Sequence, residues 1–472
     1  MKPASSVLIL EFNELTPRLM SRWMQEGLLP GFKRLFDESC VYITDAEEDP
    51  PELEPWIQWV TVHTGLRYAE HGVFDLGDGH KLRAPRIWNH VSDAGGRVWI
   101  CGSMNAGSSG RALNGAILPD PWSVGFTPYP SGKFEPFFNL IRTYVQEYTR
   151  DKVPLSKRDY AAFGLFMVRH GLSLTTVWNT VKQLAGEQRG LGKWRRAMIL
   201  DRLMWDLFRC EWQRQKPNYA TLFLNSTAHL QHYYWRALEP DAFLLKPSPA
   251  EQESYRDAIL AGYQAMDELV QEGLALIEGT NTALVLLTGL SQQPLTAYEA
   301  SGGKQLFRPR DPLALLRFAG VHDEATYAPV MAEEFRLYFR DGEAAQRASL
   351  ALRSLRLGEL AVMRVRGEGR ELFVACDINH TPAESARVHA PGARDEPRFD
   401  ALFYPVESIK SGGHHRDGLF WVRSAERAHR VVAEKVPLSR VAPMLARLAG
   451  LSESDIAAKL PAGSLEPAVA AE

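Results

Sequence analysis

The chain has 472 residues, of which 45% are hydrophobic and 24% are charged. These proportions are those of an ordinary folded protein, and the length suits one large domain with insertions, or two domains. The formal net charge of −3 at pH 7 gives no overall positive field, which excludes recruitment of nucleic acid by bulk charge.

The amino terminus and the cysteines bear on where the protein works. Only four consecutive apolar residues, Val7–Leu10, precede Glu11, far fewer than the core of a signal peptide or a membrane span contains. The four cysteines are far apart and form no CxxC pair, so neither a zinc knuckle nor a disulfide framework is predicted. We therefore expect a cytoplasmic protein with no membrane span.

Along the chain, apolar runs typical of strands alternate with stretches of helical spacing. Val7–Phe12 is almost continuously apolar, as in a parallel strand buried on both faces. Helical spacing follows at 15–39, and the same alternation recurs at 86–103, at 219–225 and at 253–290. This order predicts an α/β fold with a mostly parallel central sheet and helices on both faces.

Two segments interrupt the alternation. Residues 130–215 contain long amphipathic runs, which predict a helical insertion capping the carboxyl edge of the sheet. Residues 330–400 contain β-branched runs and predict a small strand-rich insertion. The α/β core then comprises 1–129, 216–329 and 401–455, and residues 456–472 are expected to form a flexible tail.

Polar residues follow several of the predicted strands, at the edge where open parallel sheets bind their ligands. Candidates at this edge are Glu11, Asn13, Glu14, Asn225, Ser226, His229, Gln231, His232, His414, His415 and Asp417, with Glu52 and Glu54 before a predicted helix. The sequence therefore predicts several histidines and acids on one side of the sheet.

Each candidate also has a purely structural interpretation. His229 and His232 share a face of a helical turn and suit a metal, but a hydrogen-bonded structural pair has the same spacing. Glu11 ends a buried strand, where an unpaired carboxylate is costly, and a salt bridge there is the alternative. Glu54 suits a helix cap. His414 and its neighbour suit a solvated loop.

Several motifs together resemble a known family. VLILEFNELTPRLM, PWIQWVTVHTGLRYAEHGVFDLGD, FLNSTAHLQHYYW, LVLLTGLSQQ, GGHHRDGLFWV and VPLSRVAPMLARLAGL resemble, in this order, the landmarks of the alkaline phosphatase superfamily. The branch that they resemble is the type I phosphodiesterase and nucleotide pyrophosphatase group. The resemblance covers most of residues 6–120 and 218–452. It implies two zinc-like ions that hold a phosphoryl or sulfuryl ester, and a Thr or Ser nucleophile.

The resemblance implies that one of the two ion sites is lost. The family's first-strand Asp falls on Asn13, and its nucleophile falls at or beside Glu54. Its Asp-His pair after a later strand falls on Gly289 and Leu290, which are not metal ligands.

The second ion site is partly kept. Of the family's Asp and His spaced four apart, the Asp falls on Ala228 and the His is kept as His232. The family's last His is kept as His414, and His229 lies one residue from the lost Asp. The resemblance thus implies at most one ion.

These observations lead to a set of expected roles. We expect one divalent ion, zinc or manganese, on His232 and His414, with Glu54 as general base or nucleophile. A metal-free acid/base set at the same place is the alternative. The expected catalytic residues are Glu54, Asn13, His229 and Glu11, and the expected substrate-binding residues are Asn225, Gln58, Trp235 and His415.

Three functional hypotheses follow. The first is a hydrolase or group-transfer enzyme for a phosphoric or sulfuric ester, acting on a small anionic molecule with a sugar or nucleoside group. The second is a catalytically inactive binding or assembly protein that keeps the fold. The third is a metal-independent enzyme of another reaction class, such as a lyase or acyl transferase, in the same pocket. The sequence does not predict the oligomeric state.

Overall fold

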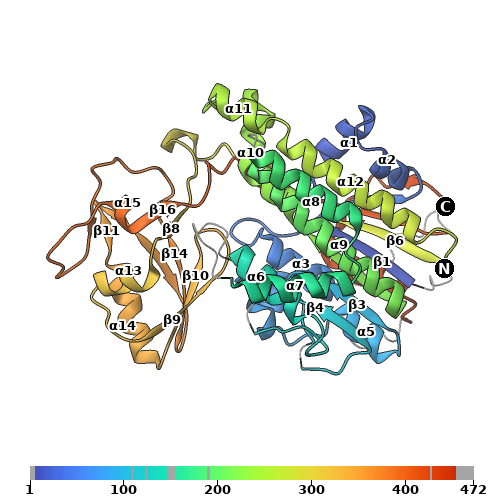
Figure 1. Cartoon of the computed structure of the whole chain (residues 1–472), viewed down its shortest axis with the longest axis horizontal. Helices are drawn as coiled ribbons and strands as arrows, with labels where there is room; N and C mark the ends of the chain where they lie inside the picture. The colour runs from blue at the N-terminus through green and yellow to red at the C-terminus, as the bar shows by residue number, and fades with distance from the viewer. Residues whose placement is uncertain are drawn as a thin grey trace.

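The computed structural model describes residues 6–108, 110–123, 125–146, 155–188, 192–425 and 428–452. The predicted tail at 456–472 lies outside these residues. Figure 1 shows two parts, a large layered core and a smaller lobe at the left. The fold is α/β, with a nine-stranded, mostly parallel central sheet and several small antiparallel sheets, as the sequence predicts.

The central sheet has the strand order β19-β2-β18-β6-β1-β5-β3-β4, and β20 pairs with β2. All neighbours are parallel except β18, which runs antiparallel to β2 and β6. The strands are β1 (Ser6–Phe12), β2 (Cys40–Asp45), β3 (Val98–Cys101), β4 (Gly115–Leu118), β5 (Tyr219–Leu224), β6 (Thr282–Leu287), β18 (Asp417–Arg423), β19 (Arg430–Val431) and β20 (Val436–Pro437).

The central strand β1 explains why its sequence is almost continuously apolar. Leu8 and Leu10 point into one hydrophobic core, and Val7 and Ile9 point into the other, because successive side chains of a strand alternate between faces. Both faces of the sheet are therefore buried under helices.

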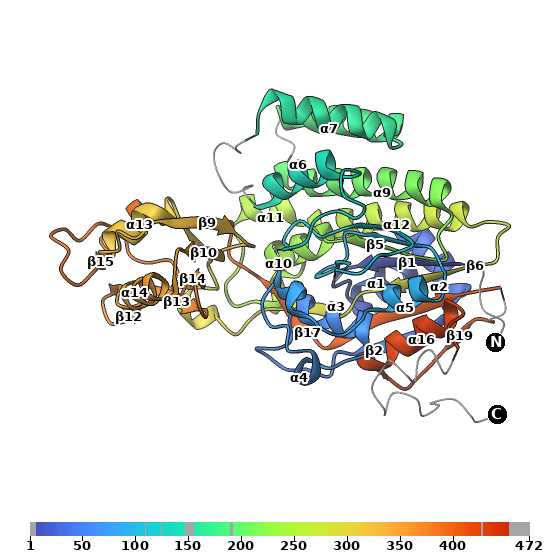
Figure 2. The same cartoon turned by 90° about the horizontal axis from the view of Figure 1, so that it is seen from below.

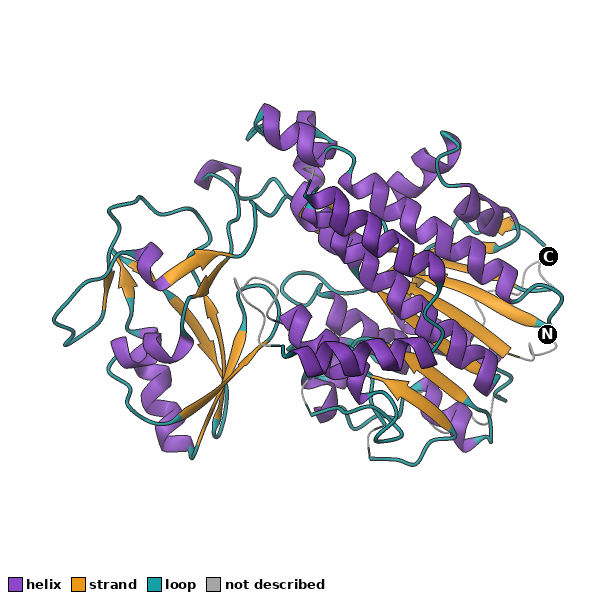
Figure 3. Ribbon diagram, viewed as in Figure 1, coloured by secondary structure: helices purple, strands orange, loops and turns teal. Residues whose placement is uncertain are grey.

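Helices cover the two faces, as Figure 3 shows. One core contains residues of α1 (Pro17–Gln25), α2 (Pro30–Asp37), α9 (Arg196–Gln215), α10 (Ser226–Leu238) and α12 (Ala258–Leu276). The other core contains residues of α3 (Pro55–Thr64), α5 (Ile87–Asp93) and α16 (Val441–Leu448). Short helices α4 (Tyr68–His71) and α11 (Pro249–Tyr255) lie outside these layers. None of the described helices is both long and apolar enough to cross a bilayer.

One helix of the helical segment packs on a face of the sheet. The segment contains α6 (Glu135–Gln146), α7 (Lys157–Arg169), α8 (Leu174–Glu187) and α9. Helix α9 contacts β3 and β5, and its Phe208 stacks on Trp99 of β3 with ring centroids 6.3 Å apart. The apolar side of α9 therefore completes the core of the sheet.

The smaller lobe is built on the antiparallel sheet β13-β14-β10-β9. Its main strands are β9 (Ala325–Pro329), β10 (Phe335–Phe339), β13 (Met363–Arg366) and β14 (Glu371–Cys376). Helices α13 (Pro312–Phe318), α14 (Gly342–Arg353) and α15 (Phe399–Leu402) share its separate hydrophobic core. The pairing of β8 (Phe307–Pro309) with β16 (Phe403–Pro405) extends the lobe beyond 330–400 at both ends. The strands β11 (Arg356–Leu357), β12 (Leu360–Ala361) and β15 (Val388–His389) form a third small sheet.

Two arginines join the lobe to the core. Arg336 of β10 donates to Asp78 Oδ1 at 2.8 Å and to the carbonyl of Leu76 at 3.0 Å, and its side chain is 2% exposed. Arg366 of β13 donates to Asp75 Oδ1 at 2.7 Å. The contacts of Arg336 are therefore shielded from water, whereas the side chain of Arg366 is 40% exposed.

Candidate metal centre

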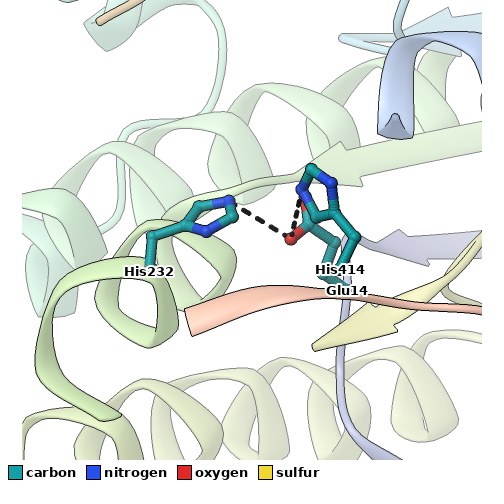
Figure 4. A group of neighbouring side chains, drawn as sticks. All are labelled: Glu14, His232 and His414. Atoms are coloured by element: carbon teal, nitrogen blue, oxygen red, sulfur yellow. Dashed lines mark ion pairs between the residues drawn. The ribbon is translucent and has the colours of Figure 1, made fainter. Parts of the chain in front are cut away.

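A carboxylate and two imidazoles meet where β1 ends. Glu14 follows β1, His232 lies on α10, and His414 lies on the short strand β17 (Gly412–His415), which pairs with β7 (Ser291–Pro294). One donor atom from each residue lies within 4.8 Å of the other two. Glu14 Oε2 is 3.3 Å from His232 Nε2 and 3.6 Å from His414 Nε2, as Figure 4 shows. Three distant parts of the chain therefore converge at this point.

The local backbone and its neighbours aim the Glu14 carboxylate at the imidazoles. Glu14 has a positive φ of 62°, so the chain turns sharply just after the strand. Asn13 Nδ2 donates to Glu14 Oε1 at 2.8 Å, and Gln292 Nε2 donates to the other oxygen. Burial raises the pKa of Glu14 to about 7. Trp59 Nε1 holds Asn13 in turn, at 2.8 Å from its Oδ1.

The two histidines present unprotonated nitrogens to this carboxylate. His232 Nδ1 lies 3.1 Å from the carbonyl oxygen of Gly412. Because a carbonyl oxygen can only accept a hydrogen bond, Nδ1 carries the proton and Nε2 has a free lone pair. Burial lowers the pKa of His232 well below its usual range and that of His414 to about 3. His414 Nε2 is buried and has no hydrogen-bond partner among the described residues.

A fourth group, Glu54, stands at the open side of the centre. It precedes α3, and its Oε2 lies 3.4 Å from His414 Nδ1. Its side chain is 31% exposed, compared with 2% for Glu14. Burial raises the pKa of Glu54 to about 7, which the charges of Lys410 and Lys304 partly offset.

The donor set fits a divalent cation. Two neutral imidazoles and one carboxylate are ligands that zinc accepts at sites which keep a position open. The hydrogen bond from His232 Nδ1 to a backbone carbonyl is the arrangement that fixes a ligating imidazole. An unpartnered buried nitrogen on His414 is costly unless an ion or a proton donor meets it. The geometry therefore supplies three of the four ligands of a tetrahedral site.

Several predicted residues lie at this centre or beside it. His232, His414 and Glu54 are brought together, and Asn13 supports Glu14 through a hydrogen bond. Asn225 accepts a hydrogen bond from Asn13 Nδ2 at 2.8 Å. The structure places the rings of His232 and His414 with centroids 5.3 Å apart, and Glu54 lies beside His414.

Two further histidines lie at the margin. His229 Nε2 is 3.2 Å from Glu407 Oε1 and forms no part of the three-residue donor group. His415 pairs with Ser291 across the β17–β7 ladder, and its Nδ1 accepts from the backbone N–H of Asp417 at 3.1 Å. Both side chains are engaged in contacts outside the centre.

Three predicted residues lie apart from the centre. Glu11 points to the opposite side of the sheet, where Ser103 Oγ donates to it at 2.6 Å. Gln58 is buried, and its Nε2 donates to the carbonyl of Glu52 at 3.1 Å. Trp235 is 0% exposed and donates to Glu239, so this indole belongs to the core and offers no face to a substrate.

Glu14 and Lys410 are the two residues whose importance the sequence understates. Glu14 was one polar candidate among many after β1, and only its left-handed backbone directs it to the imidazoles. Lys410 lies on the chain leading into β17, and its charge acts on Glu54, Glu14 and His232. The nearest sequence signal is its position four residues before His414.

Comparisons with known proteins give a likeness of shape. No family model matches the sequence, and no curated protein matches it. Among solved structures, phosphonoacetate hydrolase from Sinorhizobium meliloti 1021, in complex with phosphonoformate, has a TM-score of 0.41 and 14% identity, over 95% of this chain and 96% of that one. Murine ectonucleotide pyrophosphatase/phosphodiesterase 5, an inactive variant in complex with AMP, has a TM-score of 0.39 and 12% identity, over 97% and 96%. The human protein has a TM-score of 0.38 and 11% identity, over 97% and 100%. Similarity this low gives no information on function, so we infer function from the residues of the centre.

Proposed function

We propose that this protein is a metal-dependent hydrolase or group-transfer enzyme that acts on a phosphoric or sulfuric ester. The observation that carries the proposal is the donor set of Glu14, His232 and His414 with a buried, unpartnered His414 Nε2. These residues would hold one divalent cation, zinc or manganese. The motif resemblance to the alkaline phosphatase superfamily supports an ester of this kind as the substrate class.

A cation held there would polarise an oxygen of the bound ester and favour the build-up of negative charge in the transition state. The residues around it would hold its ligands in place. Gly412 and the side chain of Gln292 orient His232 and Glu14 respectively, which fixes the donor atoms before any substrate arrives.

Glu54 is the residue that we assign to proton transfer. It is the most exposed acid of the group, and its second oxygen is free to meet water or a hydroxyl group at the open side. As a carboxylate it would accept the proton of the attacking oxygen nucleophile and later return it to the leaving group. His414 Nδ1, at 3.4 Å, holds the carboxylate in position.

Lysine side chains suit the charge of the substrate. Lys410 and Lys304 face each other across a backbone bridge, and Lys410 makes no ion pair within 4 Å with any described residue. An anionic ester would receive their positive charge without a competing salt bridge. Their placement beside Glu54 favours substrates with at least one charged oxygen outside the scissile bond.

The test combines metal binding with turnover. We expect zinc or manganese to raise the melting temperature of the metal-stripped protein and to bind by calorimetry with one ion per chain. Para-nitrophenyl phosphate, bis-para-nitrophenyl phosphate and para-nitrophenyl sulfate then sort monoesters, diesters and sulfate esters. The Glu14→Gln variant removes a ligand, and Glu11→Gln is its matched control. Absence of any metal binding would contradict the proposal, and metal binding without turnover would favour a binding protein.

A further inference from the structure

The outermost helices of the protein carry an unusual surface. Helix α9 lies on the sheet and α8 packs on α9, while α7 packs on α6. Figure 1 shows α7 and α8 in front of the sheet, and Figure 2 shows α7 as the layer farthest from it.

Helix α8 has the reverse of the usual polarity of a surface helix. Leu174 and Trp178, four residues apart, are 87% and 67% exposed. Thr176 and Gln183 point the other way and are 1% and 9% exposed. Polar side chains of α8 thus face the protein, where Gln183 Nε2 donates to the carbonyl of Gly192 at 3.2 Å. An amphipathic helix normally buries its apolar side, so we expect the apolar side of α8 to be covered by a binding partner.

Helix α7 continues the same surface. Leu165 and Val168 are 54% and 69% exposed, while Phe166 and Met167 of the same helix point into the core. A turn at Gly171 leads directly into α8, where the backbone N–H of Ser173 donates to a carboxylate of α9. The two helices therefore present their apolar residues from one fixed unit.

Together these side chains form what we call the outer apolar face. It consists of Tyr160, Leu165, Val168, Leu174, Val177, Trp178, Val181 and Leu184. Among the described residues, these eight are more than half of the fourteen exposed large hydrophobic side chains, although α7 and α8 are a small part of the chain. Scattered exposed apolar residues are ordinary, but their concentration on two consecutive helices favours an interaction surface.

Basic residues surround this face. The described residues from 155 to 188 and from 192 to 196 contain seven Lys and Arg but only two Asp and Glu, in a chain whose overall charge is −3. On α7, Arg158 and Arg169 lie seven residues before and four residues after Leu165, which places all three on one side of the helix. Lys182 is exposed on α8, four residues after Trp178. Two copies of such a surface would repel each other, whereas an anionic surface would attract it.

We propose that the outer apolar face docks the protein onto the surface of an anionic lipid bilayer. Helices with aliphatic and tryptophan side chains on one side, flanked by Lys and Arg, lie in the plane of the membrane interface. Basic residues next to the bilayer gain from its negative surface potential. The attachment is peripheral, since no described helix is suited to span a bilayer. The proposal is independent of the metal centre.

The test is flotation of the full-length protein with vesicles of two compositions. We expect binding to vesicles of equal parts phosphatidylglycerol and phosphatidylcholine, at least tenfold stronger than binding to phosphatidylcholine alone, and weakened by salt. The double variant Leu174→Ser with Trp178→Ser should lower the bound fraction at least tenfold. Leu244→Ser is the matched control, because Leu244 is also 87% exposed but lies away from α7 and α8. The double variant should keep the wild-type melting temperature and turnover of a soluble ester.

Two results would overturn the proposal. One is that wild-type protein fails to float with the anionic vesicles at low salt, or floats equally well when Leu174 and Trp178 are replaced. The other is a homodimer, seen by light scattering, that the double variant dissociates while vesicle binding is absent, which would assign the face to a second copy. A charge variant, Lys157→Glu with Lys182→Glu, separates the basic residues from the apolar ones and should also reduce binding to anionic vesicles.

Discussion

Two buried carboxylates, three residues apart at the end of β1, have similar partners and different surroundings. Glu11 Oε1 lies 3.4 Å from His63 Nε2, and Glu14 Oε2 lies 3.3 Å from His232 Nε2. His63 is 1% exposed, whereas His232 is 18% exposed. A carboxylate–histidine pair thus lies on each side of the end of β1. Only the pair with the more exposed histidine can be reached by a ligand from solvent.

We call Glu11 with His63 the inner pair and Glu14 with His232 the outer pair. The burial of the inner pair away from solvent determines its protonation state. Burial raises the pKa of Glu11 to about 8 and lowers the pKa of His63 to about 3, so both are neutral at pH 7. Glu11 Oε1 and His63 Nε2 form no hydrogen bond at this distance, and Ser103 donates to the other oxygen of the carboxyl group. At the outer pair, Lys410 favours the charged form of Glu14. The inner pair is thus structural, and the outer pair is suited to an ion.

The largest expected effect contrasts the two glutamates directly. Glu14→Gln should lower turnover of the preferred ester by roughly a thousandfold, because an ion-held oxygen is worth several kcal/mol in the transition state. Glu11→Gln should leave turnover close to that of the wild type, since an amide keeps this buried side chain uncharged and Glu11 lies apart from the centre. Steady-state kinetics at saturating metal measure both. Equal losses in the two variants would remove the distinction between the pairs.

A smaller effect on turnover is expected for replacement of Glu54. The inner pair has no residue that corresponds to Glu54. Glu54→Gln should lower kcat by about a hundredfold, as loss of a general base does, while the metal affinity stays near that of the wild type. Calorimetry and single-turnover kinetics check the two quantities separately. A loss of metal affinity, with turnover recovering at high metal, would instead assign Glu54 to holding His414.

The inner pair predicts a pH dependence of stability. Burial raises the pKa of Glu11 from its ordinary value of 4.5 to about 8, so the folded state binds an extra proton between these two pH values. The stabilisation is complete below pH 4.5 and is lost as the pH rises to about 8, at up to about 1.4 kcal/mol per pH unit. Urea unfolding of wild type and Glu11→Gln from pH 5 to 8 measures this, and the variant should show the flatter profile. If the free energy of unfolding of the two proteins changed with pH in parallel, protonation of Glu11 would not be the cause of the pH dependence.

The smallest expected effect concerns the charge beside the outer pair. Lys410→Met should raise KM for an anionic ester by about fivefold, the equivalent of about 1 kcal/mol, with little change in kcat. A neutral phosphotriester is the control substrate, and its KM should not rise. An equal rise for both substrates would indicate a general change in the pocket rather than recognition of charge.

The sequence predicts the layered core well, because burial on both faces leaves a direct trace in a strand such as Val7–Phe12. It also identifies His232 and His414 as members of one site. It gives Glu14 only as one polar candidate among many, because no local pattern shows that a left-handed backbone turns this side chain toward the imidazoles, where Gln292 and Asn13 hold it. Trp235 illustrates the opposite failure, since an aromatic residue near the site and one in the core have the same spacing.

The attachment of the lobe by Arg336 has a consequence for how substrate enters. Swinging the lobe away would separate the guanidinium of Arg336, which is 2% exposed, from the oxygens of Asp78 and Leu76, although its pairing with Glu371 inside the lobe would remain. These contacts favour the arrangement in which the lobe and the core stay together. We therefore expect a small molecule to reach Glu54 without separation of the two parts.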